Sequence, residues 1–276
     1  MHSEYPPTLP AEYADIEFEN NAQRLPLVLC LDTSSSMAGA PIQTLNDALA
    51  EWTRELHDDV SLSYSVEVAV ITFGGRGVGA WRGPQLLDPR TPMSPFVPAH
   101  AFQAPRFTAS GVTLMTEALE LAMHVVAARK AELRASGLQY YRPQICLVTD
   151  GLPTDGTGHM TDSWHRLLPV LAEEQQARRF RLYAIGVGGI TDRGEQVLQA
   201  FAPKFNARIQ GFPFRELLQM MSASANAEQR GAGDEVFEKI FSQFKTQRPA
   251  WESLRSARTS RCTARRRCRR RPGPGR

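Results

Sequence analysis

Uninterrupted apolar runs alternate along the chain with stretches in which apolar residues recur every three or four positions. Runs that largely lack a polar face predict strands buried on both sides of a sheet. They occupy residues 25–31, 64–73, 143–149 and 181–187, with a shorter run at 207–210. The three-and-four spacing predicts amphipathic helices, which occupy residues 39–58, 113–134, 163–178, 193–201, 214–225 and 236–244.

Strands and helices therefore alternate from residue 25 to residue 225. This order predicts an α/β fold, with a doubly wound, mostly parallel sheet and helices on both faces. Residues 78–107 are rich in proline and predict one short edge strand in a long loop, and residues 17–19 predict another short strand or an edge cover. Ligands of such sheets bind at the carboxyl ends of the strands, where the strand order reverses.

The first apolar run ends abruptly in a polar segment that contains Asp32, Ser34 and Ser36. Their i, i+2, i+4 spacing lets one carboxylate and two hydroxyls turn toward one point, as the ligands of a hard cation do. Two later loops offer Thr113, just before a helix, and Asp150, just after a strand. The two carboxylates offset the charge of a divalent cation, so this set predicts Mg²⁺, with Mn²⁺ as the alternative.

Three hydroxyls and two mostly water-bridged carboxylates leave at least one position of an octahedral shell open. An open position accepts an Asp or Glu side chain of a partner protein, so we expect binding without catalysis. A metal-dependent phosphohydrolase that uses Asp32 as nucleophile or ligand is the rival hypothesis. It is disfavoured because the neighbours of Asp32 are hydroxyls where that mechanism needs a second acid, and no Gly-x-Ser-x-Gly segment offers a nucleophile instead.

Simpler interpretations of the same residues remain open. Asp and Ser are favoured helix caps, so the segment around Asp32 could cap a helix with no metal. Thr108 or Ser110 could take the place of Thr113, and Asp155 is typical of a residue that caps its own loop.

The formal charge of +3 conceals two parts of opposite sign. Residues 248–276 contain 11 Arg and one acid, a net charge of +10, whereas residues 1–247 carry −7. The tail could bind nucleic acid or an anionic membrane. Because it lacks interleaved aromatic residues, we interpret it as a terminal extension that is not under selection for function.

No apolar stretch is long enough to span a membrane, and the first residues lack a signal-peptide pattern, so a cytoplasmic protein is expected.

Three segments together resemble the metal-ion-dependent adhesion site of von Willebrand factor A domains: Asp32-x-Ser34-x-Ser36 after a strand, Gly111-x-Thr113 before a helix, and Thr149-Asp150-Gly151 after a later strand. The resemblance implies a six-stranded sheet of order 3-2-1-4-5-6 with one antiparallel edge strand. It implies that Ser34, Ser36 and Thr113 ligate the metal, that Asp32 and Asp150 act directly or through water, and that the domain mediates protein–protein interaction.

The resemblance spans about residues 16–225 and is greatest to the bacterial single-domain type associated with tellurium resistance. That type implies a stress or phosphosignalling system and a protein kinase or a PP2C-type phosphatase as the partner. The expected organisation is a lead-in at 1–15, the domain at 16–225, a helical extension at 226–247 and a tail at 248–276. One departure is Ser35, where the family often has glycine.

Overall fold

The computed structural model describes residues 22–75, 77–88, 90 and 93–246. The predicted lead-in at 1–15, the possible strand at 17–19 and the Arg-rich tail at 248–276 lie outside these residues. None of the helices within them is long and apolar enough to cross a membrane.

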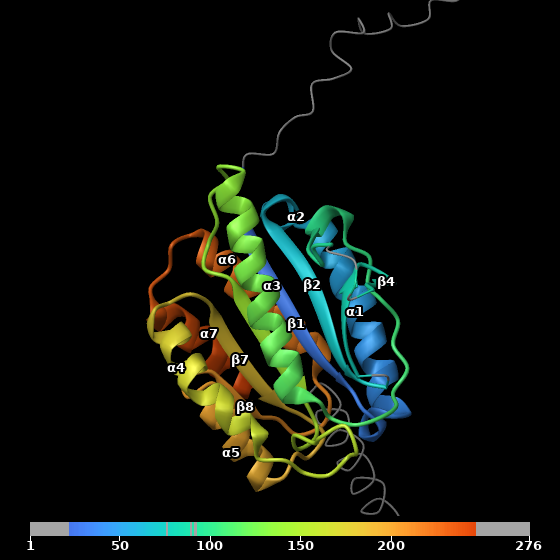
Figure 1. Ribbon diagram of the computed structural model, residues 1–276. Helices are drawn as coiled ribbons and strands as arrows, with labels where there is room; N and C mark the ends of the chain where they lie inside the picture. The colour runs from blue at the N-terminus through green and yellow to red at the C-terminus, as the bar shows by residue number, and fades with distance from the viewer. Residues whose placement is uncertain (1–21, 76, 89, 91–92, 247–276) are drawn as a thin grey trace, which may run out of the picture.

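Within the described residues, one eight-stranded sheet has the order β4-β3-β2-β1-β6-β7-β8, with β5 paired to β2 beside this path (Figure 1). The strands are β1 (Leu25–Thr33), β2 (Val66–Gly74), β3 (Gly77–Arg82), β4 (Gln85–Leu86), β5 (Val97–Pro98), β6 (Gln144–Thr149), β7 (Arg181–Gly186) and β8 (Asn206–Arg208). Strands β1, β2, β6, β7 and β8 are parallel, and β3 is antiparallel to β2. The predicted fold is confirmed, and the order 3-2-1-4-5-6 corresponds to β3-β2-β1-β6-β7-β8. The two-residue strands β4 and β5 are additions to it.

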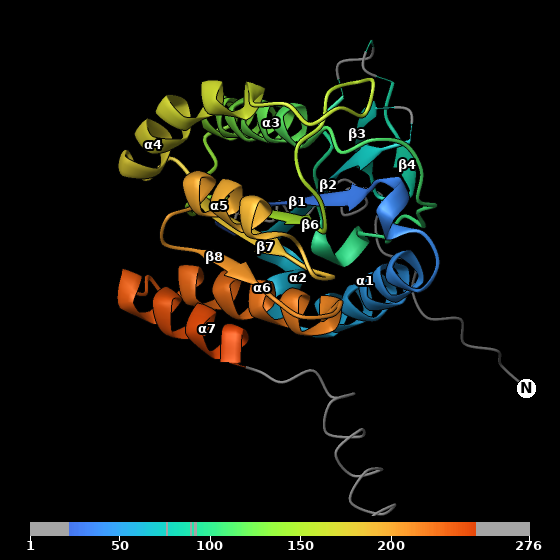
Figure 2. The ribbon, with the colours of Figure 1, turned by 90° about the horizontal axis from the view of Figure 1, so that it is seen from below.

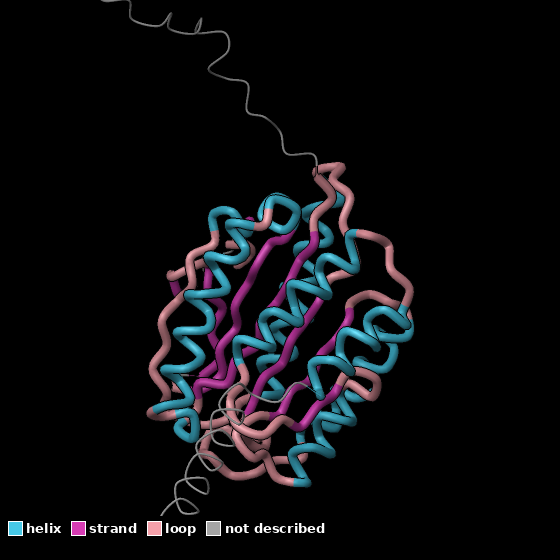
Figure 3. The backbone as a smooth tube through the Cα atoms, turned by 180° about the vertical axis from the view of Figure 1, so that it is seen from behind, coloured by secondary structure: helices cyan, strands magenta, loops and turns pink. Residues whose placement is uncertain are grey.

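The helices form two layers, with the sheet between them, as the view from below shows (Figure 2). They are α1 (Ala40–Asp58), α2 (Val60–Ser65), α3 (Met115–Ala135), α4 (Leu168–Gln176), α5 (Asp192–Phe201), α6 (Phe214–Gln229) and α7 (Asp234–Thr246). Helices α3, α4 and α5 cover one face, and α1, α6 and α7 cover the other (Figures 2 and 3). Short 3-10 turns lie at Ser35–Met37, Ala99–Ala101 and Ser163–Leu167.

Strand β1 lies at the centre of the sheet and is buried along its whole length. Leu27 and Leu29 pack into the core on the α1 side, whereas Val28 and Cys30 pack into the core on the α3 side. The strand is apolar from Leu25 to Leu31 because both of its faces are covered, and it becomes polar only at its end, with Asp32 and Thr33. Cys146 on β6 is opposite Leu29 and packs on the α1 side, so it cannot bond to Cys30, and both thiols are free and buried.

Helix α2 was not predicted, and the helix predicted at 163–178 begins with a 3-10 turn and becomes α-helical only at Leu168. Helix α2 is one short element whose Val60 and Tyr64 are exposed, so it carries no apolar periodicity. Asp59 starts it, because the Asp59 side chain accepts hydrogen bonds from the backbone N–H groups of Ser61 and Leu62.

Helix α7 lies in the predicted extension at 226–247. Its Phe237, Phe241 and Phe244 side chains are buried in the same core as those of α1 and α6. Helix α6 ends at Gln229, beyond the limit of 225 expected for the domain. The described chain therefore continues in one packed body past that limit.

The strand order reverses at β1, which lies between β2 and β6. The parallel register pairs Thr33 with Gly74 of β2 and Leu31 with Val148 of β6, so the carboxyl ends of the three strands are level. The loops that follow them lie together at one edge of the sheet, the lower end in Figure 1. This is the place where ligands bind in open α/β sheets.

Candidate metal centre

Asp32 lies at the end of β1 with 1% of its surface exposed. One carboxylate oxygen accepts a hydrogen bond from the backbone N–H of Ser34 at 2.8 Å, and the other accepts one from the Thr149 hydroxyl at 2.6 Å. Burial raises the pKa of Asp32 to about 6, against the opposing effect of hydrogen bonds from Ser34 and Thr149, and the charge of Asp150 raises it further. The fold therefore holds a carboxyl group where its charge is disfavoured.

Ser34, Ser36 and Asp150 form a chain of hydrogen bonds beside Asp32. The hydroxyl oxygens of Ser34 and Ser36 are 3.0 Å apart, and the Ser36 hydroxyl donates to Asp150 Oδ1 at 2.6 Å. Burial raises the pKa of Asp150, which the hydrogen bond from Ser36 partly offsets. Residues separated by 114 positions in the sequence thus share one polar cluster.

Thr113 lies in the loop before α3, because the helix begins at Met115 and not at residue 113 as predicted. Its backbone N–H donates to the Thr154 hydroxyl at 2.8 Å, and its carbonyl accepts from the Thr154 N–H at 3.0 Å. A methyl group placed on Gly151 would lie 3.3 Å from the Thr113 hydroxyl oxygen. The Thr113 hydroxyl therefore faces the residue next to Asp150, and Thr154 fixes the backbone that carries it.

Thr108 and Ser110, the alternatives to Thr113, line a cavity of about 290 Å³ beside Gly75. Asp155 caps its own loop, since its Oδ1 accepts hydrogen bonds from the backbone N–H groups of Thr157 and His159.

Three features that hold the loops together were missed by the sequence reasoning. Thr149 binds the Asp32 carboxylate. Ser35, treated only as a departure from the family pattern, donates from both its N–H and its hydroxyl to the Gly111 carbonyl, at 3.1 and 3.0 Å. Gly111 has φ +73°, and a methyl group on it would lie 2.5 Å from the Gly75 nitrogen. Gly111 and Thr149 both stand in motifs that are visible in the sequence, Gly111-Val112-Thr113 and Thr149-Asp150-Gly151, whereas nothing in the sequence signals the contact of Ser35.

The donor set fits a small, hard divalent cation. Two carboxylates and several hydroxyls converge, and no basic side chain of the described residues contributes to the pKa shift of either carboxyl group. The described residues contain no group of three or more His, Cys, Asp or Glu side chains arranged to hold a metal. Neutral hydroxyls would therefore supply the remaining ligands, as Mg²⁺ and Mn²⁺ accept.

Comparison with solved structures finds proteins that share 12–19% sequence identity with this chain. The pilus adhesin SpaC of Lactobacillus rhamnosus GG is 16% identical with a TM-score of 0.49, over 81% of this chain and 31% of its own. The pili tip protein Mfa5 of Porphyromonas gingivalis is 12% identical with a TM-score of 0.45, over 76% and 97%. The manganese-loaded TRAP protein of Plasmodium vivax is 19% identical with a TM-score of 0.41, over 71% of each chain. This chain thus spans about a third of SpaC.

A comparison with curated protein sequences finds no match. The family profile of the von Willebrand factor type A domain matches residues 27–214, a range that contains the three loops and well over half of the 276 residues. The chain belongs to the von Willebrand factor type A domain family.

Proposed function

We propose that this chain is a metal-dependent protein–protein interaction module. Its family often mediates interactions of this kind and is usually non-enzymatic. The proposed metal residues are Asp32, Ser34, Ser36, Thr113 and Asp150, with Mg²⁺ as the cation and Mn²⁺ as the alternative. The observation that carries the proposal is the hydrogen-bonded cluster of two carboxylates and several hydroxyls at the ends of β1 and β6, to which no basic side chain of the described residues belongs. The hydroxyl of Thr113, from a third loop, lies beside Gly151 next to this cluster.

The bound cation would supply positive charge and a coordination position for a carboxylate of the partner. The protein's own residues prepare that position in two ways. The buried pair of Asp32 and Thr149 fixes the inner side of the site, and Ser36 and Asp150 present oxygen atoms near the surface. An Asp or Glu side chain of the partner protein would approach from the exposed side, and no covalent bond would form or break.

The physiological setting that we propose rests on the sequence resemblance alone. It is a bacterial stress, tellurium-resistance or phosphosignalling system in the cytoplasm, with a protein kinase or a PP2C-type phosphatase as the partner. Two free, buried thiols at Cys30 and Cys146 are compatible with a reducing compartment. The proposed domain limits stay at 16–225, with the extension at 226–247.

Calorimetric titration of the full chain with Mg²⁺ and Mn²⁺ tests the site. We expect binding by the wild type, and loss of that binding in Asp32→Ala and Asp150→Ala. Asp162→Asn is the matched control, because Asp162 is an exposed acid that pairs with Arg193 outside the cluster. Absence of binding by the wild type, or equal binding by Asp32→Ala, would contradict the proposed site.

Affinity capture with and without a chelator tests the interaction. We expect partner proteins to be retained in Mg²⁺ and released by chelation, and a chain that ends at Gln247 to retain them equally well. A phosphatase activity that disappears in Asp32→Ala would instead establish the enzyme hypothesis. Loss of capture on truncation would assign a function to the Arg-rich tail.

A further inference from the structure

A cavity of about 480 Å³ lies near the amino ends of the parallel strands, whereas the proposed metal site lies at their carboxyl ends. It opens at the amino end of β7 and is bounded by α4, by the loop before β8 and by the first residue of α7. Its lining residues are Arg142, Ala172, Gln175, Gln176, Arg178, Arg181, Leu182, Pro203, Lys204, Phe205 and Asp234. The volume is in the range of about 300–1,000 Å³ that is typical of sites for small molecules.

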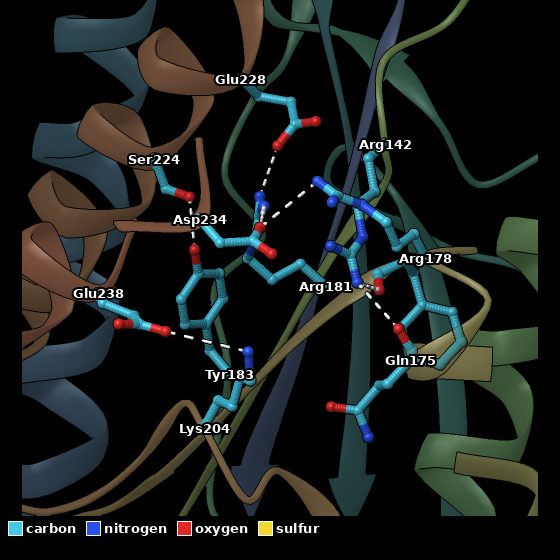
Figure 4. Close-up of polar contacts among 11 residues, drawn as sticks. Arg142, Gln175, Arg178, Arg181, Tyr183, Lys204, Ser224, Glu228, Asp234 and Glu238 are labelled. Atoms are coloured by element: carbon cyan, nitrogen blue, oxygen red, sulfur yellow. Dashed lines mark hydrogen bonds and ion pairs between the residues drawn. The ribbon is translucent and has the colours of Figure 1, made fainter. Parts of the chain in front are cut away.

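One side of this cavity is basic, as Figure 4 shows. Arg181 is only 2% exposed and is paired with Glu228 and, at 3.3 Å, with Asp234. Its guanidinium also lies 3.3 Å from the centre of the Phe237 ring. Because Arg181 is buried and held by two acids and a ring, it forms the fixed base of the cavity.

Arg142 differs from Arg181 because it has no acidic partner among the described residues. Its Nη2 donates to the Phe180 carbonyl at 2.7 Å, but no carboxylate of the described residues lies within ion-pair distance of it. Its Nε is buried and makes no hydrogen bond within the described part of the chain. Burial, together with the charges of Arg181 and Arg178, lowers the pKa of Arg142 to about 10. The fold thus keeps a guanidinium where an anion would stabilise its charge.

Arg178 occupies a backbone position that normally selects glycine. It follows the end of α4 with φ +54°, its N–H donates to the Gln175 carbonyl, and the N–H of Arg179 donates to the Glu174 carbonyl. This is the Schellman arrangement, in which the left-handed residue is usually glycine because it has no Cβ. Here the chain places a cation at the strained position, and its side chain lines the cavity. Backbone strain of this kind is typical of functional sites.

The apolar part of the lining includes Leu182, Pro203 and Phe205, and the centre of the Phe205 ring lies 5.9 Å from the Arg181 guanidinium. Arg178 also pairs with Asp234 at 3.4 Å, and Lys204 pairs with Glu238 at 3.9 Å. The basic groups of the cavity are Arg142, Arg178, Arg181 and Lys204, and their acidic partners are Glu228, Asp234 and Glu238. One positive charge is therefore in excess. A single negative charge balances it, whereas a phosphate dianion would exceed it and face Asp234.

We propose that this cavity binds a small organic carboxylate. Its carboxylate group would lie between Arg142 and Arg178, because planar guanidinium groups bind carboxylates through two parallel hydrogen bonds. Its apolar body would contact Phe205 and the neighbouring wall. The site is separate from the proposed metal site and does not depend on it.

Calorimetric titration of the full chain with acetate, phenylacetate, indole-3-acetate and octanoate tests this proposal. Metal ions are removed from all solutions with a chelating resin before the titration, so that no carboxylate binds through a metal. We expect phenylacetate or a larger member to bind, at least tenfold more tightly than acetate or inorganic phosphate, and 2-phenylethanol not to bind. Absence of binding by every carboxylate, equal binding of 2-phenylethanol, or a preference for phosphate would overturn the proposal.

Two variants locate the binding without endangering the fold. Arg178→Gly removes a cation and relieves the left-handed strain, so we expect a higher melting temperature without ligand and at least tenfold weaker binding. Lys204→Gln changes an exposed residue and is expected to weaken binding several-fold. The matched control is Arg166→Gln, an exposed arginine paired with Glu120 outside the cavity. Unchanged affinity in Arg178→Gly would place the ligand elsewhere and overturn the assignment.

Discussion

The buried carboxyl group of Asp32 should make the metal-free protein less stable than a variant that lacks its charge. Asp32 is 1% exposed and has a pKa of about 6, mainly because of burial. We therefore expect Asp32→Asn, which keeps the shape of the side chain, to unfold at a higher urea concentration than the wild type in EDTA at pH 7.5. The same variant should lose the response to Mg²⁺.

The size of the effect follows from the pKa. A rise from 3.8 to about 6 corresponds to about 3 kcal/mol of destabilisation at pH 7.5, since each pKa unit is worth about 1.4 kcal/mol. That pKa already includes the hydrogen bonds from Ser34 and Thr149, and the Asn side chain resembles the protonated carboxyl group in charge and shape. The expected gain in the free energy of unfolding is therefore about 3 kcal/mol.

The difference in the free energy of unfolding between Asp32→Asn and the wild type should grow as the pH rises. Between pH 3.8 and about 6 the folded protein keeps the Asp32 proton that the unfolded chain has released. The stability that this proton provides is complete below pH 3.8 and is lost as the pH rises through about 6. The advantage of Asp32→Asn should therefore nearly vanish at pH 4, which urea titrations of both proteins at pH 4.0 and 7.5 would measure.

Mg²⁺ should reverse the order of the two proteins. At a concentration of one thousand times the dissociation constant, the metal adds about 4.1 kcal/mol to the wild type and nothing to the variant. The exposed change Asp162→Asn controls for the loss of one acid. A variant less stable than the wild type in EDTA at pH 7.5, or a difference unaffected by pH, would refute the reasoning.

Three further substitutions test the packing around the sheet. Arg129→Met should lower the free energy of unfolding by about 2 kcal/mol in urea titrations, because the 3% exposed Glu67 loses its bidentate partner and keeps Arg24 at the longer distance of 3.6 Å. Adding Glu67→Met should restore most of the loss. Gly111→Ala should cost at least about 2 kcal/mol and weaken Mg²⁺ binding in calorimetry, whereas Gly137→Ala, with a similar φ and open space, should cost about 1 kcal/mol. Phe237→Ala should cost about 3–5 kcal/mol in one cooperative transition, and a separate early transition would show that α7 is not part of the core.

The short elements show where sequence patterns fail. Strand β1 and strand β6 were predictable because both faces of each are covered, so their central positions form an uninterrupted apolar run and only their terminal residues are polar. Helix α2 and strand β4 bury little, so they leave no apolar period to detect. Their positions depend on local capping and on pairing with a neighbouring strand.

Part of the proposed metal site could be predicted from the sequence. Asp32, Ser34 and Ser36 form one local motif, and Thr113 and Asp150 stand at the ends of predicted elements. The roles of the residues that support them could not be predicted from the sequence. The register of β1 and β6 places Thr149 beside Asp32, and the approach of two loops places Ser35 against the Gly111 carbonyl.

The existence of the basic cavity follows only from the tertiary structure. Its arginines and its lysine are spread over residues 142–204 in separate elements, without a motif that joins them. The sequence by itself determined the α/β class, the central strands and the oxygen-rich loop, because local polarity and spacing encode which positions are buried. Which distant loops meet, and which charges are left unpaired, depends on long-range strand register and helix packing, which no local pattern contains.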